Sequence, residues 1–419
     1  MLSDRTSPRL RAGVLVTGLA VLATAFGGPA VAAGDGGTAA KTPPRAEAAG
    51  DVVSVQRSVF RTSPSERADV TSWKITYRST SATGKRNLVS GTVLVPNDGA
   101  GSPDAPRPLV SYAVGTVGMG DRCAPSATLP RGTTAEGVLI SLLLARGWAV
   151  AVTDYEGLGT RGTHTYTVGR SAGHAVLDIA RAAQRLPQAA AHGITADSPV
   201  GTMGYSQGGQ ATGWAAQLHH TYAPGLDLRG SVAGGVPARL TAGLREDEGV
   251  GATFPLMTLI GHDAAYPDVR LAPHLNRTGR ALAQRLSRGC LESNLAAGSA
   301  YRLSDLMVSD PGTSPRWQQR LEESSLGGVA PRHPVFLYHG AADDLVSPQL
   351  GEDLGRDWCA RQADVEWLPL PGADHLLAIG AGQRPAADWL ADRFADAPSP
   401  VTPSPATPPA GLPSAGACG

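Results

Sequence analysis

Lysine is almost missing from this chain of 419 residues, which contains only Lys41, Lys74 and Lys85. Lysine and arginine together number 36, and aspartate and glutamate also number 36, so the formal net charge is zero. Nucleic acids and anionic membranes are bound by clustered positive charge, and a balanced chain has no such excess. The composition therefore argues against a nucleic-acid partner.

Long hydrophobic runs are also missing, apart from one near the N-terminus. Arg5, Arg9 and Arg11 flank or precede the apolar stretch AGVLVTGLAVLATAF, and a small-x-small cleavage site follows at Ala32. This order is typical of an export signal. The apolar run is short for a bilayer span, and no basic stop-transfer segment follows it. We therefore expect residues 1–32 to be a signal peptide, no transmembrane anchor, and a secreted, extracellular protein.

Cysteine is scarce, and its spacing is unlike that of metal or redox motifs. The four cysteines are Cys123, Cys290, Cys359 and Cys418, and no Cys-x-x-Cys pair occurs among them. We therefore expect no metal site. In an oxidising compartment an even number of cysteines is typical of disulfides. Two structural disulfides are predicted, for which the sequence itself allows three pairings.

The two ends of the mature chain have little to bury. Residues 33–50 are small and polar, which predicts a flexible linker. Residues 397–419 carry seven prolines and few apolar groups, which predicts an extended tail. Cys418 lies in that tail, and a disulfide there would tie it to the body. The globular domain is expected over residues 51–396.

Between these ends, strand-like and helix-like segments alternate. The expected strands are residues 72–79, 87–96, 108–115, 148–154, 198–205, 227–235, 333–340 and 365–370, and the expected helices are residues 135–147, 172–186, 207–222, 347–362 and 384–395. Continuous apolar strands alternating with helices predict an α/β fold, with a parallel sheet covered on both faces. Ligands of such sheets bind at the carboxyl ends of the strands.

Two serines lie within the pattern Gly-x-Ser-x-Gly, which is typical of serine hydrolases. Ser206 lies in GYSQG, and Ser171 lies in GRSAG. A nucleophile on such a turn needs a buried strand before it and a helix after it. Both serines precede helical patterns, so the segment before each serine decides between them.

The length of the crossover favours Ser206. The strand ending at Asp154 leaves 14 residues before Gly169, too few for a crossover helix and a further parallel strand. The helix over 171–186 and a strand ending at residue 205 do fit before Ser206. Ser206 is therefore the predicted nucleophile, and Ser171 is predicted to begin a helix with its side chain near the first-turn amides.

A serine hydroxyl needs a base, and the base needs an acid to orient it. In hydrolases built on such sheets the chain order is Ser, then Asp or Glu, then His. His375 lies in the loop after the last strand, and Asp343, with Asp344 as the alternate, follows the strand over 333–340. His339 ends that strand, and its pattern leaves core packing and support of the site equally open. Asp374 directly precedes His375, which makes it a poor orienting partner.

The oxyanion of an acyl-transfer reaction needs two N–H donors. The backbone N–H of Gln207, directly after the nucleophile, is the first predicted donor. The second is expected from the loop GTVGMGDRCAPS after the strand over 108–115, at Thr116.

Five motifs together resemble the secretory lipase family, the lipase A type of fungi and its exported bacterial members. They are GYSQGG, VTDYEGLGT, CAPS, HGAADDLVSP and GADH, and the resemblance runs from about residue 52 to 396. It implies an α/β-hydrolase fold with a mostly helical lid inserted between the nucleophile and the acid, where residues 237–325 break the alternation. It also implies a Ser206–Asp343–His375 triad and the disulfides Cys123–Cys290 and Cys359–Cys418. Within the expected lid, ATFPLMTLIGH fits either an acyl-binding wall or core packing.

The sequence thus predicts a secreted lipase or carboxylesterase that hydrolyses carboxylic esters, acylglycerols among them, through an acyl-enzyme and without a cofactor. Its expected partners are an ester or lipid substrate and, transiently, a lipid interface, and we expect a monomer. Alternatives on the same triad are a short-chain esterase, a polyester hydrolase, an acyltransferase or a peptidase. The pentapeptide also resembles that of cutinases, which are shorter and lack the long insertion. A catalytically silent secreted binding protein is the alternative of another class, and the complete triad argues against it.

Overall fold

The computed structural model describes residues 47–243, 250–395 and 416–418. The predicted signal peptide, most of the predicted linker and most of the Pro-rich tail lie outside the described residues. Residues 47–50, which the sequence assigns to the linker, already contact the domain. The Gly50 N–H donates to the Arg78 carbonyl at 2.8 Å, and Gly50 is buried.

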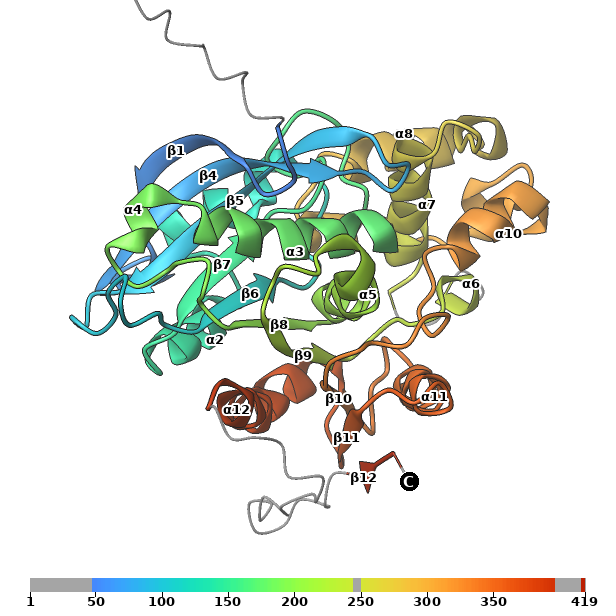
Figure 1. The fold of residues 1–419 in the computed structure, drawn as a ribbon. Coiled ribbons are helices and arrows are strands. Elements are labelled where there is room, and N and C mark those ends of the chain that lie inside the picture. Colours follow the sequence, from blue (N-terminus) through green and yellow to red (C-terminus); the bar gives the residue numbers. More distant parts are fainter. Residues whose placement is uncertain (1–46, 244–249, 396–415, 419) are drawn as a thin grey trace, which may run out of the picture. The chain divides into compact units, whose positions relative to one another are not determined.

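One large mixed sheet forms the centre of the described domain (Figure 1). In spatial order its strands are β1 (Val52–Ser58), β4 (Val70–Thr80), β5 (Arg86–Pro96), β7 (Ala149–Thr153), β6 (Leu109–Ala113), β8 (Val200–Tyr205), β9 (Leu228–Gly234), β10 (Val335–Gly340), β11 (Val365–Leu370) and β12 (Gly416–Ala417). The strands from β7 to β11 run parallel, while β1, β4, β5 and β12 pair antiparallel with their neighbours. A separate hairpin joins β2 (Arg61–Ser63) to β3 (Glu66–Arg67).

Burial explains this division between parallel and antiparallel strands. Every residue of β6, β7 and β8 is buried, as expected for central strands covered on both faces. Strand β4 alternates between buried and half-buried residues, because one of its faces lies nearer to solvent. The predicted α/β fold with a parallel sheet is confirmed. Strand β1 was not predicted, because its residues are mostly exposed and give no apolar run.

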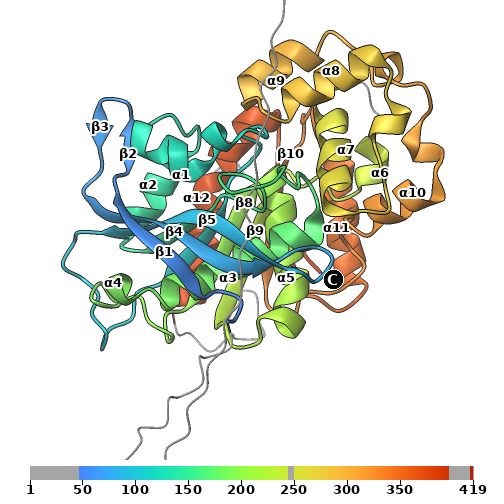
Figure 2. The same ribbon diagram turned by 90° about the horizontal axis from the view of Figure 1, so that it is seen from above.

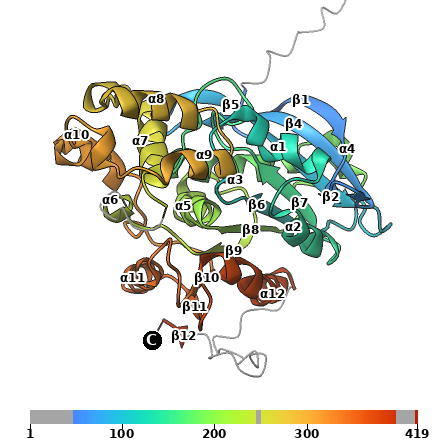
Figure 3. The same ribbon diagram turned by 180° about the vertical axis from the view of Figure 1, so that it is seen from behind.

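Helices cover both faces of the sheet (Figures 1 and 3). The helices α3 (Gly169–Gln184) and α5 (Gln207–Tyr222) lie on one face, and α2 (Gly137–Leu144) and α12 (His375–Phe394) lie on the other. The helix α11 (Pro348–Cys359) packs against α5, where the Trp358 indole N–H donates to Gln217 Oε1 at 3.0 Å. Short helices complete the connections: η1 (Asp121–Cys123), α1 (Pro125–Thr128), η2 (Leu129–Arg131) and α4 (Pro187–Ala190).

The segment between β9 and β10 forms a helical insertion at one side of the sheet (Figure 2). Its elements are α6 (Leu240–Gly243), α7 (Thr253–Ala265), η3 (Ala272–His274), α8 (Arg277–Leu286), α9 (Leu291–Gly298), η4 (Ser304–Leu306), η5 (Pro311–Thr313) and α10 (Pro315–Glu322). The insertion has a hydrophobic cluster of its own, which also takes in Met119 and Tyr166 from two loops of the main domain. Leu256, Met257 and Leu259 lie in this cluster, so the ATFPLMTLIGH stretch serves core packing there.

Both disulfides connect separate parts of the chain. Cys123, in the loop after β6, is bonded to Cys290 at the start of α9 in the insertion. Cys359, at the end of α11, is bonded to Cys418 directly after β12. This is the pairing that the family resemblance implies. None of the described helices is both long enough and apolar enough to cross a bilayer.

The Cys359–Cys418 disulfide should stabilise the domain, because it closes a long loop and so restricts the unfolded chain. We expect the double variant Cys359→Ser/Cys418→Ser to unfold at a free energy about 2–4 kcal/mol lower than the wild type. Denaturant unfolding in non-reducing buffer measures this difference. An unchanged midpoint would show that the bond contributes nothing to the stability of the domain.

Candidate active site

Ser206 occupies a strained turn between β8 and α5. Its backbone angles are φ 58° and ψ −120°, in a region that non-glycine residues rarely adopt. The Ser206 N–H donates to the Gly234 carbonyl at 2.9 Å, which holds the turn against β9. Within residues 200–217 every residue except Ser206 is buried. The turn therefore presents one accessible hydroxyl at the carboxyl end of the sheet.

The two glycines around Ser206 are required by close backbone contacts. A Cβ atom on Gly208 would lie 1.9 Å from the Ala113 carbonyl oxygen, and one on Gly204 would lie 2.4 Å from the Gly208 carbonyl oxygen. Neither contact is sterically allowed, so any larger residue would push α5 away from β6. The Gly-x-Ser-x-Gly pattern at this position is therefore a packing requirement of the turn.

Ser171 has a different environment, inside the first turn of α3. Its hydroxyl donates to the Glu156 carboxylate and lies 3.4 Å from the Thr165 hydroxyl, and the side chain is buried. The predicted contact with first-turn amides is thus replaced by a bond to Glu156. The glycines flanking it let α3 approach α5, because a Cβ on Gly169 would lie 1.8 Å from the Trp214 indole nitrogen.

Asp343 and His375 form a hydrogen-bonded pair at the same end of the sheet. His375 Nδ1 lies 2.6 Å from Asp343 Oδ2, and the second carboxylate oxygen accepts the backbone N–H groups of Leu345 (3.0 Å) and Val346 (2.8 Å). Asp344, the alternate acid, is exposed to solvent. The structure therefore brings Asp343, and not Asp344, to the imidazole.

His339, in β10, contacts the carboxylate of Asp343. It is fully buried, and its Nε2 lies 3.1 Å from Asp343 Oδ2 and 2.9 Å from the Val346 carbonyl. Burial acts to raise the pKa of Asp343, but the hydrogen bonds from His339 and His375 outweigh burial and hold that pKa below its usual value. The carboxylate is thus kept ionised beside His375. Of the two alternatives for His339, core packing and support of the site, the structure shows both at once.

His375 begins α12, whereas the sequence predicted a loop there and a helix only from residue 384. Asp374 caps the helix, since its side chain accepts the Leu377 N–H at 2.8 Å. This role explains why Asp374 is not the partner of the neighbouring imidazole. The His375 ring packs against Tyr205, with 5.0 Å between ring centroids. The imidazole therefore lies beside the residue that precedes Ser206.

The side chain of Gln207 is fixed by a histidine that the sequence did not single out. Gln207 Nε2 lies 3.0 Å from His164 Nε2, and His164 Nδ1 lies 3.0 Å from the Glu156 carbonyl. Burial lowers the pKa of His164 to about 4, so the ring is neutral near pH 7. A neutral ring that donates through Nδ1 accepts the Gln207 amide at Nε2.

Thr116 lies in a loop that two tyrosines hold in place. The Thr116 hydroxyl lies 2.8 Å from the Tyr166 hydroxyl, and the Tyr155 hydroxyl donates to the Val114 carbonyl at 2.6 Å. Both tyrosines come from the loop after β7, which also carries His164. No sequence pattern predicts these contacts, because the partners are about 40 to 50 residues apart.

The loop after β6, which carries Thr116, is hydrogen-bonded to the helical insertion. The N–H groups of Met119 and Gly120 donate to the Gly289 carbonyl at 2.9 and 3.2 Å, and the Leu291 N–H donates to the Val117 carbonyl at 3.0 Å. The Cys123–Cys290 disulfide lies at the end of this contact. The loop over 116–123 and the start of α9 therefore form one connected unit.

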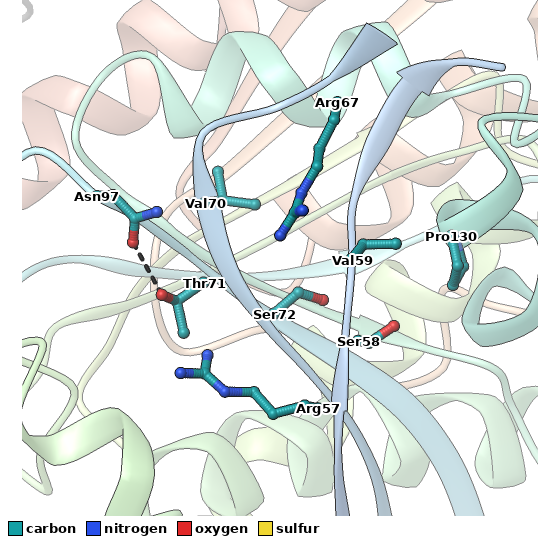
Figure 4. Close-up of a pocket in the computed structure, with 9 residues that line it drawn as sticks. All are labelled: Arg57, Ser58, Val59, Arg67, Val70, Thr71, Ser72, Asn97 and Pro130. Carbon is teal, nitrogen blue, oxygen red and sulfur yellow. Dashed lines mark hydrogen bonds between the residues drawn. The ribbon is translucent and has the colours of Figure 1, made fainter. Parts of the chain in front are cut away.

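Among the described residues no group of three or more His, Cys, Asp or Glu side chains is arranged to hold a metal ion. A hollow of about 650 Å³ lies on β1 and β4, lined in part by Arg57, Arg67 and Thr71 (Figure 4). It lies near the end of β4 that pairs with the end of β5, at the amino ends of the parallel strands. The hollow therefore lies at the opposite ends of the strands from Ser206, which follows the carboxyl end of β8.

Known structures share this architecture. Candida antarctica lipase A in its closed state superimposes with a TM-score of 0.74, at 24% identity over 83% of each chain. The rice cell wall degrading esterase LipA from Xanthomonas oryzae gives a TM-score of 0.65, at 18% identity over 83% of this chain and all of that one. These similarities confirm the α/β-hydrolase fold with its inserted helices.

Sequence relatives agree with the structural ones. Secreted triacylglycerol lipase LIP2 of Malassezia furfur is 31% identical over 64% of this chain and 59% of its own length. Lipase 5 of Candida albicans is 29% identical over 77% of this chain and 72% of its own length. A Mycobacterium tuberculosis protein named as a probable inactive lipase is 29% identical over 78% of this chain and 75% of its own length. The secretory lipase profile matches residues 124–401, and this chain belongs to the secretory lipase family.

Proposed function

We propose that this protein is an exported hydrolase of carboxylic esters, acylglycerols among them, with Ser206 as nucleophile, His375 as base and Asp343 as orienting acid. The observation that carries the proposal is the 2.6 Å bond between His375 Nδ1 and Asp343 Oδ2, next to the strained Ser206 turn. The family and its relatives support a lipase or esterase function in general. Two disulfides in the described residues fit an oxidising, extracellular location.

In the proposed first step, Ser206 Oγ attacks the ester carbonyl while His375 Nε2 takes its proton. Asp343 holds the Nδ1 proton of His375, which fixes the tautomer and stabilises the imidazolium that forms. The imidazolium then protonates the leaving alcohol, and an acyl-enzyme remains on Ser206. Water attacks that ester with His375 again as base, which releases the acid and restores Ser206.

The oxyanion of both steps would be held by the backbone N–H groups of Gln207 and Thr116. Gln207 begins α5, so its N–H belongs to the positive end of the helix dipole. The contacts of Gln207 with His164 and of Thr116 with Tyr166 support this assignment, because they fix both residues before substrate binds.

The apolar ends of two helices support contact with a lipid interface. Leu376 and Leu377 directly follow His375 and are 76% and 62% exposed. Helix α2 lies beside α12, where Gln383 Nε2 donates to the Leu139 carbonyl, and α2 exposes Val138 and Leu142. Residues 137–145 and 375–383 contain no Asp, Glu, Lys or Arg. An uncharged, apolar surface beside the site suits a neutral lipid surface.

A catalytically silent binding protein is the alternative from another class, and one relative is named as a probable inactive lipase. Loss of a triad member would favour that alternative, but Ser206, Asp343 and His375 are all present. The hydrogen-bonded acid and base and the accessible serine support catalysis in this chain.

A fluorophosphonate probe should label the wild type at Ser206, because the probe reacts with an activated serine. Ser206→Ala should abolish both labelling and hydrolysis of nitrophenyl butyrate. Ser171→Ala is the matched control, since that serine shares the sequence pattern but bonds Glu156 inside α3. Labelling of Ser206→Ala at the wild-type level would refute the assignment.

Asp343→Asn should lower kcat about 10⁴-fold, because an amide can neither hold the imidazole in the required tautomer nor stabilise the imidazolium. Asp344→Asn, one residue further on, should keep near-wild-type kcat. The low pKa of Asp343 also predicts a stabilising contribution that is present above about pH 4 and lost as the pH falls further. Kinetics on a soluble ester and acid unfolding curves of both variants measure these effects, and equal kcat losses would contradict the assignment.

Val138→Ser/Leu377→Ser should lower the rate on emulsified triglyceride about 30-fold, because each exposed apolar side chain adds on the order of 1 kcal/mol when a lipid surface covers it. The rate on a soluble short ester should stay within about twofold. Val308→Ser is the control, since Val308 is 67% exposed on the insertion and far along the chain from His375. Equal losses on both substrates would mean that these side chains do not act through the interface.

A further inference from the structure

A buried carboxyl group lies under the loop that carries Thr116. Glu136 directly precedes α2, and its side chain is buried. Its Oε2 accepts the Tyr112 hydroxyl at 2.6 Å, and its Oε1 accepts the Gly115 N–H at 2.6 Å. Among the described residues no Lys, Arg or His pairs with this carboxylate. The buried carboxyl group of Glu136 is therefore satisfied by two hydrogen bonds, without an ion pair among the described residues.

The Gly115 bond is close to the candidate nucleophile. A Cβ atom on Gly115 would lie 3.2 Å from Glu136 Oε1, 3.3 Å from the Tyr205 carbonyl oxygen and 3.9 Å from Ser206 Cβ. The backbone at Gly115 is thus held between Glu136 on one side and the Ser206 turn on the other. The next peptide along the chain carries the Thr116 N–H.

We propose that Glu136 is a positioning residue, whose carboxylate holds the Gly115 N–H and the Tyr112 hydroxyl so that the Thr116 N–H faces the oxyanion. This inference rests on the proposed ester hydrolysis at Ser206. Glu136 does not touch the substrate. It acts through the peptide between Val114 and Gly115, which carries the bonded N–H and directly precedes the peptide that carries the Thr116 N–H.

The charge state of Glu136 matters to this role. An ionised carboxylate accepts both donors at once, whereas a protonated one keeps both contacts only by donating its own hydrogen to the Tyr112 oxygen, so that the Tyr112 hydrogen loses this acceptor. Burial raises the pKa of Glu136 to about 7, although the bonds from Tyr112 and Gly115 favour ionisation. The titratable groups around it are Tyr112 on β6, Tyr155 after β7 and Tyr338 on β10. Burial raises the pKa of each well above 10, so they stay neutral while Glu136 titrates.

The raised pKa of Glu136 also makes the stability of the fold depend on pH. The folded-state pKa of Glu136 lies above that of an unfolded glutamate, so its contribution to stability is fully present below about pH 4.5 and is lost as the pH rises to about 7. Activity should change in the opposite direction, because the ionised form holds the loop. A residue kept only for the stability of the fold would show no such opposition.

Glu136→Gln tests the proposal, with a side chain of nearly the same size. On soluble nitrophenyl butyrate, kcat should fall about 10- to 100-fold, somewhat less than the loss of a whole oxyanion donor, while KM changes less than about threefold. In the wild type Glu136 must be ionised for full activity, so log(kcat/KM) should show an additional fall as the pH drops through about 7. In Glu136→Gln this additional fall should be absent, and the slope of the profile there should be smaller. The melting temperature of the variant, relative to the wild type, should rise between pH 5 and pH 8.

Tyr112→Phe gives a second test that does not depend on how well Glu136→Gln folds. Removing the Tyr112 hydroxyl takes away a bond that favours ionised Glu136, so the acid limb of the wild-type profile should move to higher pH. Glu292→Gln, an exposed glutamate on α9, is the matched control and should leave kcat and the slope unchanged. Wild-type kcat and slope in Glu136→Gln, or an unmoved acid limb in Tyr112→Phe, would overturn the proposal. Fluorophosphonate labelling of Ser206 in the same preparations separates this outcome from a failure of the proposed function.

Discussion

The contact between the first turn of α5 and the end of β6 is the constraint on which the candidate site depends. Gly208 lies so near the Ala113 carbonyl that no side chain fits between them. With the helix held this close, the chain must reverse within one residue after β8, and Ser206 takes up the strain at φ 58°. Such a conformation costs roughly 1–3 kcal/mol, which the buried strands around it offset.

The loop after β6 is held from three directions at once. Glu136 accepts the Gly115 N–H and the Tyr112 hydroxyl. Tyr155 and Tyr166, from the loop after β7, bond to Val114 and Thr116. The backbone of residues 289–291 in the insertion bonds to the backbone of this loop. The disulfide at Cys123 makes the last of these contacts covalent. Any displacement of the insertion relative to the main domain must therefore leave the start of α9 in place. The proposed oxyanion donor Thr116 and that part of the insertion belong to one connected unit.

Sequence reasoning predicted the fold because the central strands are continuous apolar runs. It predicted the strand–turn–helix at Ser206 because only one crossover is long enough. It missed the start of α12, since HLLAIGAG contains two glycines and has low helical propensity. Tertiary contacts decide there: Asp374 caps the helix, and a Cβ on Gly382 would lie 2.2 Å from the Tyr338 ring.

Glu136 and His164 were missed for a related reason. Glu136 lies in TTAEGVL, where an acidic residue at a helix start is ordinary local chemistry. His164 lies in a glycine-rich loop, 43 residues before its partner Gln207. Their burial follows from how distant loops meet over the carboxyl ends of the strands. A single sequence carries no signal for such a meeting.

Strand β12 has a consequence for how molecules of this protein meet one another. Residues 416 and 417 pair antiparallel with Trp367 and Glu366 of β11, which would otherwise be an edge strand of the sheet. An uncovered edge strand offers unpaired N–H and C=O groups on which another chain can extend the sheet. The disulfide at Cys418 keeps this short strand in place, so two residues block a route to intermolecular β-sheet growth.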